Sequence, residues 1–437
     1  MAEQKTIDFL RKKFSSFYRE NFIDSVPEIE RREFGYGEYG KKIIARHYSF
    51  GSAKEFNSFL REKTPFYVSY SPAFYDFPDK RPMERKKYLK SDIIYEFDAD
   101  DLKTECKQKH DSWKCRECKA EGKGLVERCP SCGSATETTE WVCDECLEAT
   151  KKQTLKLINF LENDFNFTEG ISVNFSGGKG YHLHLRSEKI QGLNANARIE
   201  LVDFLTAQEI DLEQLGFVYS NKKMLCPMES TAFGWSKKIL FSLKNMIEKD
   251  EAEKIAALGN ARVSTIKKIL EKKELVLKGM QNGFLFPVTR ADDSSKNFWE
   301  SLLSNLVEKE KLFLDRQTSV DLAKIIRVPN TIHGSTGLTA TEFEREKLMK
   351  FNPLKESIIF STNPLKVFVR TAPKFSLGGE NFGPFEEQET DLPEFAAIYL
   401  MARNSANLSE KQTFGKSLSK KFSPAFSEKA GIEQKRI

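Results

Sequence analysis

Apolar and polar residues alternate in several short stretches of this chain, and each such stretch predicts a β-strand. The clearest cover 41–50, 66–70, 92–98, 171–175 and 181–186. Helical spacing appears instead at 147–163 and at 6–20, where Ile7, Leu10, Phe14 and Phe17 fall on one side. The stretch 240–280, rich in Ala, Glu, Lys and Leu, is expected to be helical to about Gly279 and to form a lobe of its own. Together these elements predict a mixed α/β fold.

A glycine-rich turn between two of the predicted strands is the most informative segment. It reads Ser176-Gly177-Gly178-Lys179-Gly180 and leads into a strand with His182 and His184 on one face. Glycines expose backbone N–H groups to a polyanion, and the lysine adds a positive charge. The turn therefore predicts a site for phosphate, above all a nucleoside triphosphate. It is not a P-loop, because no Gly-Lys-Ser/Thr opens a helix.

A second predicted strand ends in acidic residues. Asp98 and Asp100 are expected to share one face of it, with Asp101 pointing away or beginning the next turn. Crowded carboxylates repel one another unless cations lie between them, and their oxygens suit Mg²⁺ or Mn²⁺. An isolated Asp-x-Asp is more often an inert, solvated corner. In the same chain as a phosphate-binding turn, the metal site is the better interpretation.

A third segment, far downstream, carries further candidates. Asp315 closes a short apolar run and is a candidate third carboxylate for the metal. Arg327 and His333 flank a Pro-Asn turn, from which both could reach phosphate oxygens. Taken alone, an Arg and a His near a turn are more often ordinary surface residues.

Cysteine is concentrated in one window. Seven of the eight cysteines lie between Cys106 and Cys146, three pairs of them spaced C-x-x-C. Zinc explains this pattern better than disulfides in a reducing compartment. With His110 the window offers eight ligands, enough for two closed and therefore structural sites. One arrangement nests an inner site of Cys115, Cys118, Cys129 and Cys132 inside an outer site of Cys106, His110, Cys143 and Cys146; a cross-braced pairing is equally compatible with the spacing.

Composition limits the remaining choices. The chain has 437 residues, with 69 Lys and Arg against 64 Asp and Glu, so its small excess charge allows local nucleic-acid contacts without arguing for them. No apolar run is long enough to cross a membrane, and the first residues have no signal-peptide core, so a cytoplasmic protein is expected.

These segments, in this order, make the chain resemble the small catalytic subunit of archaeal and eukaryotic DNA primase, the archaeal form most closely. The resemblance runs from about residue 5 to about 403. It rests on several separate motifs, namely Arg32-Glu33-Phe34, Arg46-His47-Tyr48-Ser49-Phe50, Phe97 to Leu102, the zinc knuckle after it, Trp141 to Glu148, Ser176 to Leu185, Leu314-Asp315, Arg327 to Leu338, Phe351 to Glu356 and Phe382 to Phe385.

The resemblance implies roles for individual residues. Asp98, Asp100 and Asp315 would hold two catalytic Mg²⁺ or Mn²⁺ ions. The incoming triphosphate would be bound by six residues: Ser176, Lys179, His182, Arg327, His333 and, less firmly, Arg46. Glu33 would be an acidic residue near the active site, and His184 matches the archaeal form without a secure role. The fold implied is a mixed sheet flanked by helices.

The resemblance also implies a division of the chain. The catalytic core would comprise 1–105, 147–200 and 300–403, with a zinc module at 106–146 and a mainly helical subdomain at 201–299. Cys106, His110, Cys143 and Cys146 match the family's minimal zinc module, which favours the nested pairing and makes the inner ribbon an insertion. The stretch 404–437, with seven Lys and Arg against three Asp and Glu, is expected to be a basic, mobile tail.

The activity implied is nucleotidyl transfer by a DNA-directed polymerase that makes short primers on single-stranded DNA for the initiation of replication. NTPs or dNTPs would be the substrates, a large primase subunit the partner, and the nucleoid the place of work. Three alternatives stand beside it: a stand-alone primase-polymerase in repair or damage bypass, a non-enzymatic zinc-ribbon nucleic-acid binder, and a metallohydrolase using His182 and His184 as ligands.

Overall fold

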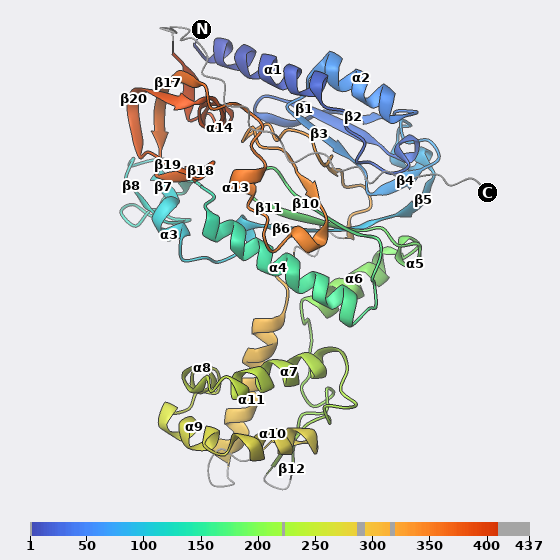
Figure 1. Ribbon diagram of the computed structural model, residues 1–437, viewed down its shortest axis with the longest axis vertical. Coiled ribbons are helices and arrows are strands. Elements are labelled where there is room, and N and C mark those ends of the chain that lie inside the picture. Colours follow the sequence, from blue (N-terminus) through green and yellow to red (C-terminus); the bar gives the residue numbers. More distant parts are fainter. Residues whose placement is uncertain (1, 221–222, 286–292, 315–319, 410–437) are drawn as a thin grey trace, which may run out of the picture.

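The computed structural model describes residues 2–220, 223–285, 293–314 and 320–409. Figure 1 shows a larger α/β body joined through a narrow waist to a smaller lobe of helices. Two four-stranded sheets form the centre of the body, one above the other, with α1 and α2 on the upper side and α4 below. The mixed α/β fold class predicted from the sequence is confirmed.

The upper sheet is antiparallel, in the order β15-β3-β1-β2. Its strands are β1 (Phe34–Glu38), β2 (Lys41–Tyr48), β3 (Tyr67–Tyr70) and β15 (Ile326–Arg327). Helices α1 (Ala2–Glu20) and α2 (Ala53–Lys63) pack on it through aromatic contacts, such as Phe34 against Phe56 with ring centroids 5.0 Å apart. α2 begins where Ser52 caps it by accepting a hydrogen bond from the N–H of Glu55.

The lower sheet has the order β16-β10-β11-β6, also antiparallel. Its strands are β6 (Ile93–Asp98), β10 (Ile171–Phe175), β11 (Gly180–Leu185) and β16 (Glu342–Phe343). Side chains alternate along β11, so that Tyr181 and Leu183 lie opposite to His182 and His184. The histidine face is turned toward the upper sheet, since the hydroxyl of Tyr70 contacts His184 Nδ1 at 3.3 Å.

Helix α4 (Asp144–Asn163) covers the other face of the lower sheet. Its buried stripe includes Leu147, Leu157 and Leu161, as its helical spacing predicts. Asp144 and Glu145 lie in the first turn, where negative charge interacts favourably with the helix dipole. Strands predicted at 41–50, 66–70, 92–98, 171–175 and 181–186 and the helices at 6–20 and 147–163 are thus confirmed, with ends shifted by a few residues.

The cysteine-rich window lies beside the body. It contains α3 (Lys107–His110) and a small antiparallel sheet of β8 (Glu121–Lys123), β7 (Ser112–Cys115) and β9 (Thr136–Thr139). Trp113, Cys115 and Cys129 form a small buried cluster of their own, whereas Cys106 and Cys146 belong to the main core. The part of the window that contains Cys106 and Cys146 therefore packs into the main core, and the part that contains Cys115 and Cys129 has a small core of its own.

The helical lobe consists of several helices, and the stretch 240–280 is helical up to Gln281, close to the predicted end at Gly279. They are α7 (Gly234–Glu248), α8 (Ala252–Leu258), α9 (Val263–Leu270), α10 (Lys273–Gln281) and α11 (Asp293–Glu310), with a sheet of β12 (Val218–Ser220), β13 (Lys223–Leu225) and β14 (Phe284–Leu285). The chain turns at Asp250 and Asn260, both with positive φ. Trp235 anchors the lobe by donating its indole N–H to the Phe204 carbonyl at 2.8 Å.

The C-terminal part adds a sheet of β20 (Phe385–Pro393), β17 (Pro364–Ala372) and β21 (Ala406–Leu408) around the fully buried α14 (Glu394–Ala402). β21 pairs with β17, so residues 404–409 belong to the fold rather than to the predicted tail; 410–437 lie outside the described residues. The remaining elements are α5 (Glu188–Gln191), α6 (Ala195–Leu205), α13 (Pro353–Glu356), β4 (Ala73–Tyr75), β5 (Tyr88–Ser91), β18 (Phe375–Leu377), β19 (Glu380–Phe382) and the 3-10 turns η1 (Ile29–Arg31), η2 (Met83–Lys86), η3 (Ala99–Asp101) and η4 (Arg345–Lys347).

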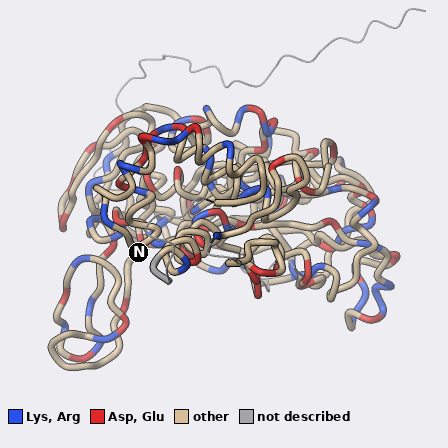
Figure 2. The backbone as a smooth tube through the Cα atoms, turned by 90° about the horizontal axis from the view of Figure 1, so that it is seen from below, with Lys and Arg blue, Asp and Glu red and all other residues tan. Residues whose placement is uncertain are grey.

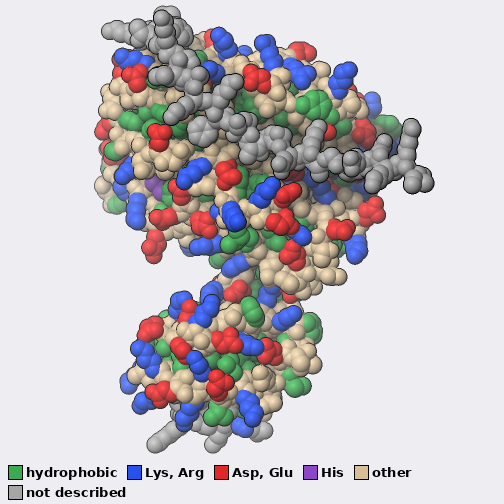
Figure 3. All heavy atoms as spheres, viewed as in Figure 1, with side chains coloured by type: hydrophobic (Ala, Val, Ile, Leu, Met, Phe, Trp, Pro, Cys, Tyr) green, Lys and Arg blue, Asp and Glu red, His purple; other side chains and the backbone are tan. Residues whose placement is uncertain are grey.

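The described part of the chain carries charges of both signs. Figures 2 and 3 show Lys and Arg interspersed with Asp and Glu over both the body and the lobe. No helix within the described ranges is both long and apolar enough to cross a membrane.

Candidate active site between the two sheets

The acidic pair lies where β6 ends. Asp98 is the last residue of the strand, and Asp100 lies in the 3-10 turn η3 that follows. The prediction that both share a strand face is therefore wrong. The strand β6 ends at Asp98. The N–H of Ala99 donates to the carbonyl of Lys179, and the N–H of Leu102 donates to the carbonyl of Ala99, which forms the 3-10 turn. Asp315 lies outside the described residues.

Asp98 is held among other carboxylates. Burial, and then the charges of Glu96, Asp100 and Asp101, raise the pKa of Asp98 to about 6. Burial also tends to raise the pKa of Asp100, but hydrogen bonds with Glu140 and Lys179 outweigh it, so that the pKa of Asp100 is lowered overall. A carboxyl group that resists ionisation in this way gains most from a cation beside it. The donor set thus fits a hard divalent ion such as Mg²⁺ or Mn²⁺.

The glycine turn lies directly beside Asp98. Gly180 pairs with Asp98 in the ladder, and a Cβ on Gly180 would come within 1.7 Å of the Phe97 carbonyl oxygen, so no side chain fits there. Ser176 Oγ accepts hydrogen bonds from the N–H groups of Gly178, Lys179 and Gly180 at 3.2–3.3 Å. The N–H groups that were expected to be free for phosphate are therefore occupied in this structure, where the Ser176 hydroxyl holds the turn in shape.

His333 packs against this turn from the downstream loop. A Cβ on Gly178 would lie 2.9 Å from His333 Nε2, so the imidazole and the turn approach closely only because glycine is there. The N–H of Ser335 donates to His333 Nδ1 at 3.2 Å, which leaves the proton on Nε2, facing the turn. Thr336 Oγ1 donates to the Gly177 carbonyl at 2.5 Å. Burial, and then Arg327, hold the pKa of His333 well below its usual range.

His182 and Arg327 complete this region with polar atoms that lack partners. His182 Nδ1 and Arg327 Nη1 are buried and have no hydrogen-bond partner among the described residues. Burial lowers the pKa of His182 to about 4 and that of Arg327 to about 10. Leaving such atoms unpaired is costly, so a ligand that satisfies them would be bound favourably.

Two residues that the sequence analysis did not select join the two sheets here. Glu96 Oε1 lies 3.6 Å from His182 Nε2, and its other oxygen pairs with the ammonium of Lys324, next to Ile325 and the strand β15. Glu96 could have been selected from the sequence, because it lies two positions before Asp98 and therefore on the same face of the strand. Lys324 carried no such signal, since its proximity to Glu96 arises only from the folding of distant segments.

His184 has a structural role. Its Nε2 lies 2.8 Å from Asn174 Oδ1, its Nδ1 lies 3.3 Å from the Tyr70 hydroxyl, and it is fully buried. Both ring nitrogens are therefore engaged by neighbours. This arrangement does not support a metallohydrolase that uses His182 and His184 as a ligand pair.

Arg46 belongs to a separate charge cluster on the upper sheet. Its Nε donates to Glu33 Oε1 at 2.8 Å, and its Nη2 donates to the carbonyl of Ala323 at 2.9 Å. The fully buried Glu33 also lies 3.4 Å from Lys86 Nζ and 3.1 Å from His47 Nδ1. Arg46 is thereby fixed beside the segment that leads to Arg327, with a third of its side chain exposed.

The cysteines and His110 form two separate four-ligand clusters. One comprises Cys106, His110, Cys143 and Cys146, the other Cys115, Cys118, Cys129 and Cys132, with the ligand atoms of each within 4.8 Å of one another. This is the nested arrangement and not the cross-brace.

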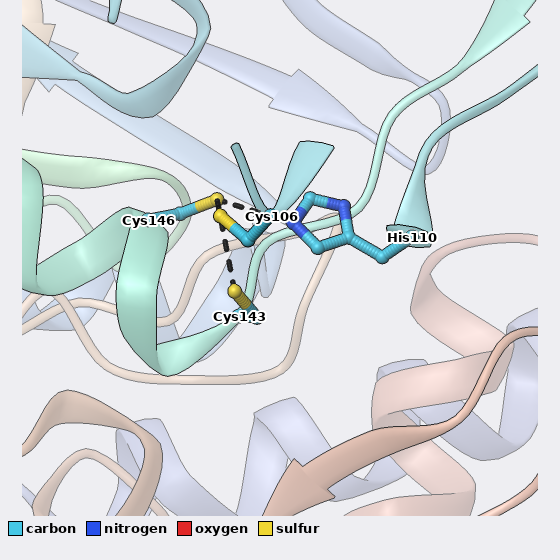
Figure 4. Close-up of side chains that lie close together, drawn as sticks. All are labelled: Cys106, His110, Cys143 and Cys146. Carbon is cyan, nitrogen blue, oxygen red and sulfur yellow. Dashed lines mark hydrogen bonds between the residues drawn. The ribbon is translucent and has the colours of Figure 1, made fainter. Parts of the chain in front are cut away.

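The outer cluster has the spacing of a tetrahedral site. Figure 4 shows its sulfur atoms and imidazole converging, with Cys146 Sγ 3.4 Å from Cys106 Sγ, 3.8 Å from Cys143 Sγ and 3.3 Å from His110 Nε2. Two thiolates on one zinc ion lie about 3.8 Å apart for Zn–S bonds of about 2.3 Å. Asp111 accepts from His110 Nδ1 at 2.8 Å, as carboxylates commonly do behind a histidine ligand. Both clusters could therefore bind zinc.

Comparison with known proteins shows which family the chain resembles. Residues 135–345 match the family model described as DNA primase small subunit. The DNA primase small subunit PriS of Methanothrix thermoacetophila is 31% identical over 430 residues, covering 93% of this chain and all of the relative. PriS proteins of Methanococcoides burtonii and Nitrosopumilus maritimus are 29% and 27% identical, each covering 92% of this chain and 98% of the relative.

The protein is thus a nucleotidyltransferase in the broad sense. It belongs to the DNA primase small subunit family, and the relatives compared correspond to it over nearly their whole length. It is the catalytic subunit of a DNA primase, and the matches do not favour the alternative of a stand-alone primase-polymerase.

Proposed function

We propose that this chain makes short primers on a single-stranded DNA template by adding NTPs or dNTPs to a growing 3′ end. A 3′-hydroxyl oxygen forms a bond to the α-phosphorus of the incoming nucleotide, and the bond from that phosphorus to pyrophosphate breaks. The observation that carries the proposal is the pair of buried, unpartnered atoms His182 Nδ1 and Arg327 Nη1; His182 lies on β11, opposite Glu96 and two residues after Gly180, the partner of Asp98.

The carboxylates would hold the catalytic metal. Asp98, Asp100 and, from outside the described residues, Asp315 would bind Mg²⁺ or Mn²⁺. When bound, such ions supply a more acidic 3′-hydroxyl and neutralise charge on the triphosphate. The raised pKa of Asp98 supports this role, because burial and then the neighbouring carboxylates disfavour its negative charge, which a bound cation would offset.

The basic and polar residues would hold the triphosphate. Arg327 and Lys179 supply positive charge, and His333 supplies an N–H directed at the glycine turn. His182 offers its unpartnered ring nitrogen, Ser176 shapes the turn, and Arg46 would contact the same nucleotide from the upper sheet. Charged donors fixed before the substrate arrives stabilise the charge that develops on the departing pyrophosphate.

The two cysteine clusters would each hold one structural Zn²⁺. With four protein ligands apiece they leave no open position for substrate, so they would stabilise the fold rather than take part in the chemistry. A large primase subunit would be the partner, as the relatives' designation as small subunits suggests. The work would take place in the cytoplasm, at the nucleoid.

Extension of a primed template tests the proposed site without requiring initiation. Asp98→Asn and Asp100→Asn should each lower extension at least about 100-fold while the thermal unfolding profile stays cooperative. Asp101→Asn, which removes a carboxylate from the same turn, is the matched control and should keep most of the activity. Full extension by Asp98→Asn would refute the assignment.

A further inference from the structure

A fourth acidic residue, Glu140, reaches the site from the cysteine-rich window. Glu140 Oε2 lies 3.0 Å from the ammonium of Lys179, which also pairs with Asp100. About a third of the Glu140 side chain is exposed, and Lys179 and Asp100 are exposed to a similar degree. Lys179 is therefore held between two carboxylates that come from distant parts of the chain.

The backbone of Glu140 is fixed on both sides. Its carbonyl accepts a hydrogen bond from Arg403 Nη2 at 2.8 Å, and the Arg403 guanidinium lies 4.1 Å from the ring centre of Trp141. The N–H of Trp141 donates to Asp111 Oδ1 at 2.8 Å, which is the same oxygen that His110 Nδ1 contacts. A continuous path of contacts thus leads from the cluster ligand His110 to Glu140.

A residue next to the outer cluster also contacts the backbone of Asp100. Lys107, the neighbour of Cys106, donates from its Nζ to the Asp100 carbonyl at 3.1 Å. The backbones of Asp100 and Glu140 are therefore both connected to residues that lie next to outer-cluster ligands. An ordinary surface ion pair, by contrast, has side chains free to separate and contributes little.

We propose that Glu140 is a positioning residue that holds the Lys179 ammonium at the mouth of the glycine turn, ready for the triphosphate. Lysine has a long stem with much conformational freedom, and fixing it in advance lowers the cost of binding. Once Asp100 binds a cation, Glu140 remains the carboxylate that keeps Lys179 in place. The inference rests on the proposed function, in which Lys179 contacts the nucleotide.

A double-mutant cycle on the full-length, zinc-loaded protein tests the inference. The probe is ATP with Mn²⁺, whose dissociation constant is measured by calorimetry, alongside the KM and kcat of primer extension. Glu140→Gln should weaken ATP binding and raise KM about five- to tenfold, with kcat nearly unchanged. In a Lys179→Ala background the same substitution should have no further effect, because its target is gone. Glu140→Asp should recover part of the loss.

The exposed Glu137 on β9 provides the matched control, and Glu137→Gln should bind ATP like the wild type. Equal ATP affinity in Glu140→Gln and wild type, or an equal loss with and without Lys179, would overturn the positioning role alone. Wild-type protein that binds neither ATP nor dATP with Mn²⁺ would instead overturn the proposed function itself. The two failures are therefore distinguishable.

Discussion

The Asp98 carboxyl group destabilises the folded chain when it is ionised. Its pKa in the fold is about 6 against an ordinary value of 3.8, so between these pH values the folded protein binds a proton that the unfolded chain has released. Stability therefore falls as pH rises from about 4 to about 6, and the full penalty remains above that window. Asp98→Asn removes the penalty and should be more stable than wild type at pH 7 by about 1–3 kcal/mol.

Thermal unfolding without added Mg²⁺ or Mn²⁺ measures this difference. The variant should unfold at a higher temperature than the wild type at pH 7, and the advantage should disappear near pH 4. An advantage of the same size at both pH values would show that Asp98 has an ordinary pKa.

The two histidines of β11 are expected to respond differently to substitution. His182→Ala removes the unpartnered Nδ1 at the proposed nucleotide site, so it should raise the nucleotide KM about 10- to 100-fold. It leaves a cavity but no unpaired partner, so it should cost less stability than His184→Ala. His184→Ala leaves Asn174 Oδ1 and the Tyr70 hydroxyl without their partner, so it should lower stability by about 2–4 kcal/mol and leave KM nearly unchanged. Steady-state kinetics and denaturant unfolding of both variants would decide, and the reverse pattern would exchange their roles.

Single residues were predictable from sequence where the signal was local. The C-x-x-C pairs and the glycine turn are recognisable from a few neighbouring positions, so their residues could be selected directly from the sequence. Glu140 and Lys324 could not be selected in this way, because their ion pairs with Lys179 and Glu96 join segments that are far apart in the chain.

At the scale of elements, the two cysteine clusters are expected to contribute unequally. Cys106 and Cys146 lie in the main core, Cys146 in the first turn of α4, whereas Cys115 and Cys129 share a small cluster with Trp113. Cys146→Ser should therefore lower the stability of the whole body and weaken ATP binding, while Cys118→Ser should leave both nearly intact. Each variant should retain about one zinc ion where the wild type holds two.

Zinc analysis by mass spectrometry, together with unfolding curves, measures these effects. The two variants serve as controls for each other, since both remove a single thiol. Equal destabilisation by the two substitutions would contradict the separation of the clusters.

Elements were predictable to the extent that their pattern is periodic. Alternation located β10, β11 and β6, and helical spacing located α1 and α4, because one buried face repeats along each. The point where β6 ends was not predictable in this way. The alternation of apolar and polar residues continues to Asp100. The N–H of Ala99, however, bonds to the carbonyl of Lys179, and the sequence around β6 does not contain this contact with a distant segment.

For the whole molecule, the two ends of the described chain meet, and this sets where it can be shortened. The N–H of Leu408 donates to Thr6 Oγ1 at 2.9 Å, and β21 pairs with β17. A chain ending after Ser409 should match the full-length protein in stability and in extension on short templates. A chain ending after Arg403 loses β21 and should be less stable by about 2 kcal/mol or more; equal unfolding temperatures for the two truncations would contradict this.

The fold class was predictable from the sequence, but the placing of one sheet above the other was not. That placing rests on pairs such as Tyr70 with His184 and Lys324 with Glu96, which no local pattern contains. The candidate site lies between the sheets, so its chemistry could be anticipated while its geometry could not.

The most direct test of the central claim is primer synthesis on unprimed single-stranded DNA. Labelled NTPs and dNTPs are supplied with Mg²⁺ or Mn²⁺ to the chain in complex with its large subunit, in wild-type form and as Asp98→Asn. The account predicts short products from the wild type and none from the variant, with both complexes folded and zinc-loaded. Products that persist in Asp98→Asn, or their absence from the wild-type complex, would contradict it.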